Sequence, residues 1–178
     1  MSKSNNFVIK GLHIVAWIIF VGLSIEAGAL IVNFIFSFFN PQVLHNLYQK
    51  LDLSEMYNHN KWIFFSMYSF ILFIAIMKAY LFYMVIRLLS KFDPSKPFSN
   101  FVSDQITQIS YTTFSIGIIS YIGRQIAISL EHYGYATDNL NPFWADSQAF
   151  VLMAAVIYAI AAIFRKGVEI QNENDLTV

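Results

Sequence analysis

Three ionisable side chains lie inside long apolar stretches of this chain, at Glu26, Lys78 and Arg124. A charge at the centre of a bilayer costs on the order of 2.5–3.5 kcal/mol even on a lenient insertion scale, so such side chains are expected to turn inward and find partners. At about 1.5 Å per helical residue, Glu26 falls near the middle of its stretch, with Lys78 about 5 Å to one side and Arg124 about 9 Å to the other. The spacing therefore predicts a carboxylate between two cations.

Further polar residues share helix faces with these charges, because residues seven apart lie on the same side of a helix. We define the intramembrane polar seam as Glu26, Asn33, Lys78, Ser120, Arg124 and Glu131. Three roles are consistent with the seam. It could bind a small anion or a polar headgroup, since two cations face one central anion, or it could pass protons through Glu26. It could also be an ion-paired network that only fixes the register of the helices.

Other kinds of chemistry find little support. The four histidines stand on separate segments, and no two of them have the spacing of metal ligands on one helix. The sequence has no Gly-rich phosphate loop, no Gly-x-Ser-x-Gly elbow and no His-Glu-x-x-His motif. It also has no cysteine, which excludes disulfides and thiolate metal sites. We therefore expect no enzymatic activity, no metal site and no cofactor.

The elements that must position the seam are four apolar stretches, at residues 11–39, 62–89, 107–130 and 148–164. A membrane-spanning helix needs about 20 apolar residues, with a range of about 17–25. Charged residues make up only 12% of the chain, where a soluble domain would have about 25%. We predict an all-α, four-helix transmembrane bundle that forms a single domain over residues 1–178. Small residues on the third stretch, such as Gly117 and Gly123, are expected to let helices approach closely.

Lysine and arginine are distributed unevenly over the two sides of such a bundle. Seven fall on the side of the two termini and the second connection, and only Lys50 and Lys61 fall on the other side. By the positive-inside rule, both termini and the connection at residues 90–106 should face the cytoplasm. The net charge is zero, so we expect no direct nucleic-acid binding. The lipid bilayer is the expected environment, and association between copies of the chain is left open.

The connections have features of their own. In the first, the apolar spacing of Val43, Leu44, Leu47, Leu51 and Leu53 predicts a short amphipathic helix on the outer surface. In the second, two prolines within Asp93–Phe98 predict a stiff corner. The third, at residues 131–147, is interpreted as a polar outer connection, and residues 165–178 are predicted to form a cytoplasmic tail.

Two segments carry a family resemblance. These are Lys96-Pro97-Phe98 in the corner and the C-terminal run from Arg165 to Val178, which closes on Asp-Leu-Thr-Val. Both are similar to a family of small four-span bacterial membrane proteins known only as a domain of unknown function. The resemblance implies a multi-pass protein of the bacterial cytoplasmic membrane. Members are often encoded beside a very small helix-turn-helix regulator of the Cro type, which implies a cytoplasmic partner. In this chain, residues 99–108 carry Asp104 and lack the basic residues that relatives have there.

Both segments fall on the predicted cytoplasmic side, where a soluble partner would meet them. The candidate docking residues are Lys96, Pro97, Phe98, Glu169, Glu173, Asp175, Leu176 and Val178. The alternation of acidic and apolar residues in the tail could add a strand to a partner's sheet or pack against a basic domain. The alternative is an ordinary solvated tail.

Two functions of different classes follow. The first is a regulatory or sensory membrane protein that binds a small cytoplasmic transcription regulator through the corner and the tail. The second is a small transporter or channel-like subunit that uses Glu26, Lys78 and Arg124 as its pathway. A purely structural subunit of an assembly is a third interpretation.

Overall fold

Four long helices dominate the computed structural model, which describes residues 3–39 and 53–175. They are α1 (Lys3–Phe39), α3 (Lys61–Lys91), α4 (Asn100–His132) and α6 (Ser147–Asp175). The segments that contain them are long and apolar enough to cross a membrane. The prediction of an all-α fold with four transmembrane helices is therefore confirmed, and the chain is a multi-pass membrane protein.

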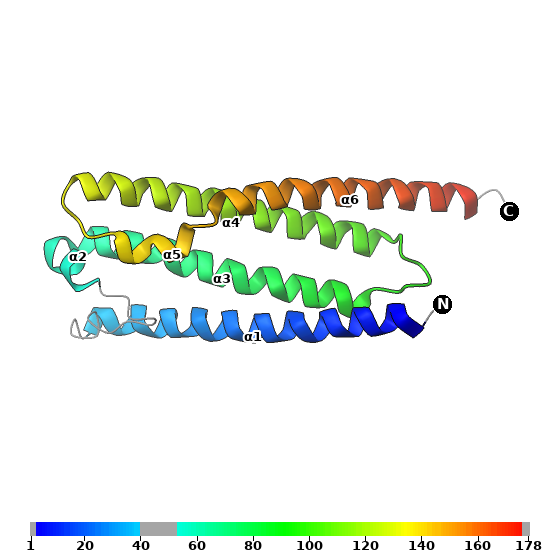
Figure 1. The fold of residues 1–178 in the computed structure, drawn as a ribbon, viewed down its shortest axis with the longest axis horizontal. Coiled ribbons are helices and arrows are strands. Elements are labelled where there is room, and N and C mark those ends of the chain that lie inside the picture. The colour runs from blue at the N-terminus through cyan, green and yellow to red at the C-terminus, as the bar shows by residue number, and fades with distance from the viewer. Residues whose placement is uncertain (1–2, 40–52, 176–178) are drawn as a thin grey trace.

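The four helices pack in a row rather than in a closed ring (Figure 1). The extensive interfaces join α1 to α3, α3 to α4, and α4 to α6. Both chain termini lie at the same end of this row. We call that end the basic end, because it holds Arg87 and Lys91 at the end of α3 and Arg165 on α6. It is the end that the charge count predicts to be cytoplasmic, and its orientation in the membrane stays a prediction.

Aromatic side chains fill the interface between α1 and α3. The Tyr68 hydroxyl donates a hydrogen bond of 3.1 Å to the carbonyl oxygen of Leu30, and the Phe34 and Tyr68 rings stack with centroids 5.2 Å apart. Nearer the basic end, Phe20 lies against Tyr83 at 6.3 Å. These pairs fix an antiparallel register between the two helices, so the position of any α1 residue relative to α3 is known.

Small residues allow α4 and α6 to approach closely, as predicted for the third stretch. A Cβ atom added to Gly117 would lie 2.7 Å from Cγ2 of Val151 and 2.9 Å from the Val151 backbone nitrogen. Seven residues away on α4, the Ser110 hydroxyl donates a hydrogen bond of 2.9 Å to the carbonyl oxygen of Ala154. Close contact and a hydrogen bond between helices are the usual sources of helix association in a bilayer.

The first connection carries a short helix, α2 (Ser54–His59), which packs against α3. Leu53, Met56 and Tyr57 are buried there. The other residues of the predicted surface helix, Val43, Leu44, Leu47 and Leu51, lie outside the described residues.

The third connection differs from the polar loop that the sequence predicts. It forms η3 (Asp138–Leu140) and α5 (Asn141–Trp144), which lie along α3 and α4 in Figure 1. Leu140, Phe143 and Trp144 are buried. The Trp144 ring packs closely on Gly123, because a Cβ atom added there would lie only 3.4 Å from the ring. The connection thus folds back along the bundle, because its apolar side chains bury themselves between the helices.

As a consequence, α6 begins in the middle of the bundle. Its first residue, Ser147, lies beside Gly117, and Gly117 stands 15 residues, or about 22 Å, before the end of α4 at His132. The sequence prediction that the fourth span starts at the outer surface is therefore incorrect. The last helix is displaced toward the basic end.

The other end of α6 corrects a second expectation. Residues 165–175 continue the helix and do not form an extended tail, so this segment cannot add a strand to a partner's sheet in the conformation described. The helix continues because Val168 is buried, Gly167 packs against the Phe98 ring, and Lys166 forms an ion pair of 2.8 Å with Glu169 one turn later. In Figure 1, α6 extends beyond the start of α4.

Candidate functional site

The three predicted charges of the seam are half-buried, but they are not joined directly. Within residues 3–39 and 53–175, no ion pair or hydrogen bond connects Glu26 to Lys78 or to Arg124. The α1–α3 register nevertheless places Glu26 level with residues 72–77 of α3, so Lys78 lies one to six residues, or about 2–9 Å, from it along the helix axis. This range includes the offset of about 5 Å that their spacing predicts.

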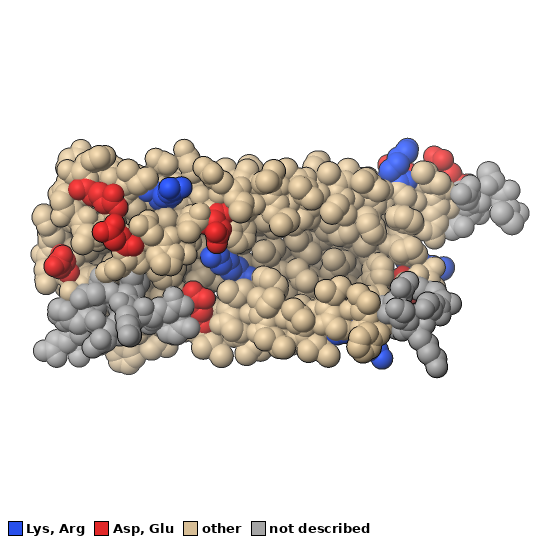
Figure 2. All heavy atoms as spheres, viewed as in Figure 1, with Lys and Arg blue, Asp and Glu red and all other residues tan. Residues whose placement is uncertain are grey.

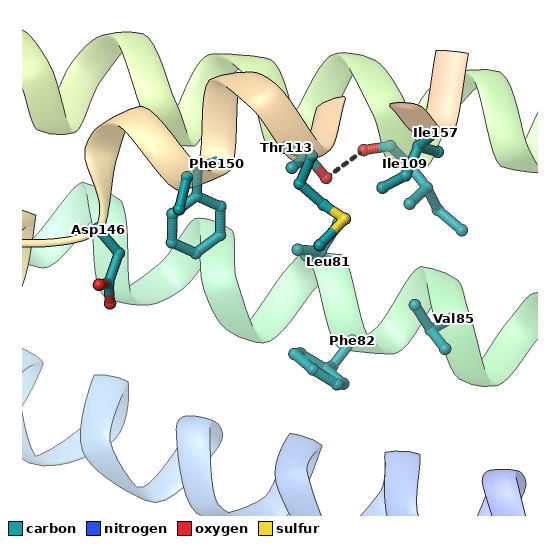
Figure 3. Close-up of a pocket in the computed structure, with 10 residues that line it drawn as sticks. Leu81, Phe82, Val85, Ile109, Thr113, Asp146, Phe150 and Ile157 are labelled. Carbon is teal, nitrogen blue, oxygen red and sulfur yellow. Dashed lines mark hydrogen bonds between the residues drawn. The ribbon is translucent and has the colours of Figure 1, made fainter. Parts of the chain in front are cut away.

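Lys78 also faces the start of α6. Its Nζ atom lies 5.6 Å from the centroid of the Phe150 ring, at a distance typical of a cation–π contact. The backbone N–H of Phe150 donates to the carbonyl oxygen of Asp146, so Asp146 stands one turn before this ring. Figure 3 shows the Asp146 carboxylate pointing from the start of α6 toward α3.

Asp146 is thus the acidic residue near Lys78 that sequence reasoning missed. The sequence predicts that Asp146 lies in an outer connection. The apolar residues of Leu140–Trp144 just before it are the signal that could have indicated a position along the bundle. We call Glu26, Lys78 and Asp146 the central charge cluster. In Figure 2, red and blue atoms meet near the middle of the visible face, between α1 and the start of α6. Two carboxylates and one ammonium make the cluster's formal charge negative.

A cavity of about 360 Å³ adjoins the cluster between α3, α4 and α6 (Figure 3). Its wall is apolar except for Asp146 and Thr113, and the Thr113 hydroxyl already donates a 2.7 Å hydrogen bond to the Ile109 carbonyl oxygen. The lining side chains are Leu81, Phe82, Val85, Ile109, Thr113, Asp146, Ala149, Phe150, Met153 and Ile157. Asp146 is therefore the one ionisable residue among those that line the cavity, and it stands at the end of the cavity beyond Phe150.

Arg124 belongs to a separate region of the bundle. Its neighbour Gly123 faces Phe70, eight residues before Lys78, which separates the two cations by about 12 Å along the axis. Near it, Ser120 is only 1% exposed and its hydroxyl has no hydrogen-bond partner among the described residues. The Glu131 carboxylate, in contrast, accepts a hydrogen bond of 2.5 Å from the Thr137 hydroxyl.

The six seam residues therefore divide into two groups. Glu26 and Lys78 lie at mid-bundle, whereas Ser120, Arg124 and Glu131 lie toward the end opposite the basic end. Asn33 is half-buried on α1, seven residues beyond Glu26 in the same direction. Across the described parts of the chain, no three His, Asp or Glu side chains are close enough to share a metal ion.

The corner after α3 is stabilised by its own hydrogen bonds. The backbone N–H and the hydroxyl of Ser95 donate to Oδ1 of Asp93, at 2.8 and 2.7 Å. These bonds, the one from the hydroxyl foremost, hold the pKa of Asp93 below its ordinary value. The turn places Lys96 on the surface and directs the chain through Pro97 to Phe98.

The corner and the end of α6, predicted separately, come together in the structure. The Phe98 ring lies 5.3 Å from that of Phe164 and rests on Gly167, where a Cβ atom would collide with it. Beyond this contact, Glu169 and Glu173 are exposed and Ile170 is 50% exposed. We define the docking surface as Phe98, Glu169, Ile170 and Glu173.

Not every predicted docking residue can be placed. Leu176 and Val178 lie outside the described residues, as does the side chain of Asp175. Glu169 accepts a hydrogen bond of 2.8 Å from the Lys166 ammonium group.

Comparison with known proteins identifies a family but no individual relative and no function. No curated protein and no solved structure matches the chain. A family described as "Protein of unknown function (DUF2975)" matches residues 48–178, which include α2, α3, α4 and α6. This match supports the part of the resemblance that concerns a domain of unknown function, whereas the neighbouring regulator stays a prediction. The chain belongs to the DUF2975 family.

Proposed function

We propose that this chain is a regulatory membrane protein that binds a small cytoplasmic partner through its docking surface. The observation that carries the proposal is the projection of α6 past the start of α4, where Phe98 packs on Gly167 beside it. The two segments that the family resemblance singles out thereby form one surface. The proposal takes the basic end to be cytoplasmic, as the excess of lysine and arginine there predicts.

The chemistry of the surface indicates the kind of partner. Ile170 and Phe98 offer apolar contacts, and exposed carboxylates flank them. From Gly167 to Asp175 the sequence has three acidic residues and no basic one. A helix with this pattern suits a partner that has an apolar groove with a basic rim. A small helix-turn-helix protein encoded beside this chain, as the family resemblance implies, is the partner that we propose.

The test is a binding titration between the two purified proteins. The full-length chain is held in phosphatidylcholine nanodiscs and titrated with the neighbouring helix-turn-helix protein. A docking variant combines Glu169→Gln, Ile170→Ser and Glu173→Gln. A control variant combines Tyr133→Ser and Asp138→Asn, which remove an exposed ring and a carboxylate at the opposite end.

We expect the docking variant to raise Kd at least tenfold, or roughly 1.4 kcal/mol. The control variant should bind like the unaltered protein. Absence of binding by the unaltered protein, or equal binding by the docking variant, would contradict the proposal.

One observation favours the transporter as a second candidate. The helix α6 begins at mid-bundle beside the central charge cluster, and interrupted helices that end near the bilayer midplane are common in transporters. Proteoliposomes that enclose a pH-sensitive dye would test for proton movement. The candidate requires that Lys78→Gln or Asp146→Asn change the rate, and equal rates in these variants and in empty liposomes would exclude proton transport.

A further inference from the structure

The cavity between α3, α4 and α6 lies open on the apolar surface of the bundle. Met153 on its wall is 55% exposed, and Ala149 is exposed as well. Because these positions lie within the membrane-spanning length of α6, a molecule would reach the cavity from the bilayer. A volume of about 360 Å³ with an apolar wall and few polar groups is typical of a small-molecule site.

The charge at one end of the cavity selects the kind of ligand. Asp146 is one of the lining residues, at the end of the cavity beyond Phe150, and its exposed side chain has no hydrogen bond or ion pair to any other described residue. Glu26 lies at a similar height, and Lys78 supplies one ammonium group against these two carboxylates. Unpaired carboxylates in an apolar environment are costly, so a second cation would stabilise the cluster.

Asp146 is what changes the balance that the sequence predicts. The seam as predicted has one carboxylate, Glu26, between two cations, and binding of an anion or a polar headgroup is one of its three predicted roles. The structure separates Arg124 from Lys78 by about 12 Å along the axis, close to the separation of about 14 Å that the predicted heights give, and it adds Asp146 near Lys78. With this second carboxylate, the charges around Lys78 favour a cation.

We propose that the cavity binds a lipophilic amine from the bilayer. Its ammonium group pairs with the Asp146 carboxylate, and its apolar body occupies the space between Phe82, Phe150 and Met153. The Phe150 ring, which already lies near the Lys78 ammonium, offers its face to the ligand's ammonium as well. The site is independent of the docking surface, so it stands or fails separately from the proposed function.

Three probes with one skeleton and three charges test the proposal. They are 4-phenylbutylamine, 4-phenylbutanol and 4-phenylbutyrate, each titrated by calorimetry into the full-length chain in phosphatidylcholine nanodiscs. We expect the amine to bind at least about tenfold more tightly than the alcohol, because a charge-assisted hydrogen bond exists only for the amine. The carboxylate should bind weakest. Equal affinity for amine and alcohol, or no binding of any probe because an acyl chain fills the cavity, would overturn the proposal.

Variants separate the ion pair from the cavity itself. Asp146→Asn should reduce the affinity for the amine to that for the alcohol, while unchanged binding of the alcohol shows that the variant is folded. Asp138→Asn removes a carboxylate outside the cavity and should change nothing. Lys78→Gln removes the competing ammonium and should tighten amine binding several-fold, a gain that a misfolded protein cannot produce. Retention of the amine preference by Asp146→Asn, or weaker amine binding by Lys78→Gln, would contradict the assignment.

Discussion

Gly117 shows how one missing methyl group sets the geometry of the bundle. A Cβ at this position would approach the Val151 backbone nitrogen to 2.9 Å and the Ser147 carbonyl oxygen to 3.1 Å. Backbone atoms cannot move aside as a flexible side chain can, so any substitution forces α6 away from α4. The residue therefore holds the first turn of α6 at mid-bundle, and with it Asp146 and the cavity.

We predict that Gly117→Ala destabilises the protein by about 1–3 kcal/mol, the usual cost of overpacking a tight interface. Gly22→Ala is the matched control, because nothing lies within 4 Å of a Cβ there. The control should be neutral or slightly stabilising, since alanine is the better helix former by up to about 1 kcal/mol. Thermal unfolding in detergent compares the two variants, and equal midpoints would contradict the close approach.

Asp93 gives a prediction of pH dependence at the corner. Hydrogen bonds from Ser95 hold the folded-state pKa of Asp93 below its unfolded value. The stabilisation of the corner is thus fully present above the unfolded pKa and is lost as the pH falls through the folded one. An NMR titration of the Asp93 carboxyl should give a midpoint below the ordinary value for aspartate. Ser95→Ala removes the hydroxyl hydrogen bond, which lowers the pKa more than the backbone hydrogen bond does, so this variant should raise that midpoint. An unchanged midpoint would contradict the role of the hydroxyl.

At the scale of residues, the sequence predicts that Glu26 and Lys78 lie within about 5 Å in height, but it does not predict the third member of their cluster. Counting residues along helices gives heights only when each helix starts at the membrane surface. The sequence misplaces Asp146 relative to Lys78 because that assumption fails for α6. A buried Trp144 in a connection that reads as polar is the physical cause.

At the scale of elements, hydropathy predicts which residues span the membrane better than where each span begins. The structure places α3 at Lys61–Lys91, close to the predicted 62–89, because apolar composition alone marks such a helix. The apolar run 148–164 has the same composition whether α6 starts at the surface or at mid-bundle. Its position depends on the contact at Gly117 and on the fold of α5, which are tertiary features.

The absence of cysteine from the chain makes the position of α6 directly testable. Three variants, each with a single cysteine in place of Gln148, Tyr133 or Asn172, are treated with a membrane-impermeant maleimide. Tyr133 ends α4 and Asn172 lies on the projecting part of α6, so both should react, from opposite sides of the membrane. We predict that Gln148→Cys reacts far more slowly, because it lies in the first turn of α6 at mid-bundle.

Two outcomes of the labelling experiment would contradict these expectations. Reaction of Gln148→Cys at the rate of Tyr133→Cys would place the start of α6 at the surface, as the sequence alone predicts. Reaction of Tyr133→Cys and Asn172→Cys from the same side would contradict the four-span topology.

At the scale of the whole molecule, one helix connects the two proposed sites. Phe150 and Met153 on α6 face the cavity, Asp146 immediately precedes this helix, and Glu169, Ile170 and Glu173 on the same helix form most of the docking surface. The row arrangement leaves α6 with one main helical neighbour, α4. The apolar stretches predict the four spans, and the distribution of lysine and arginine predicts their orientation. A row and a ring have the same composition, so the arrangement could not be predicted.

The central claim is that the docking surface holds a regulator at the membrane, and the cellular distribution of the regulator tests it most directly. The small helix-turn-helix protein that we propose as the partner is tagged fluorescently and imaged in bacterial cells. The cells express either the unaltered chain, the docking variant with Glu169→Gln, Ile170→Ser and Glu173→Gln, or the control variant with Tyr133→Ser and Asp138→Asn. We predict that the tagged protein lies at the membrane with the unaltered chain and the control variant, and throughout the cytoplasm with the docking variant. A cytoplasmic distribution with the unaltered chain, or membrane localisation with all three, would contradict the account.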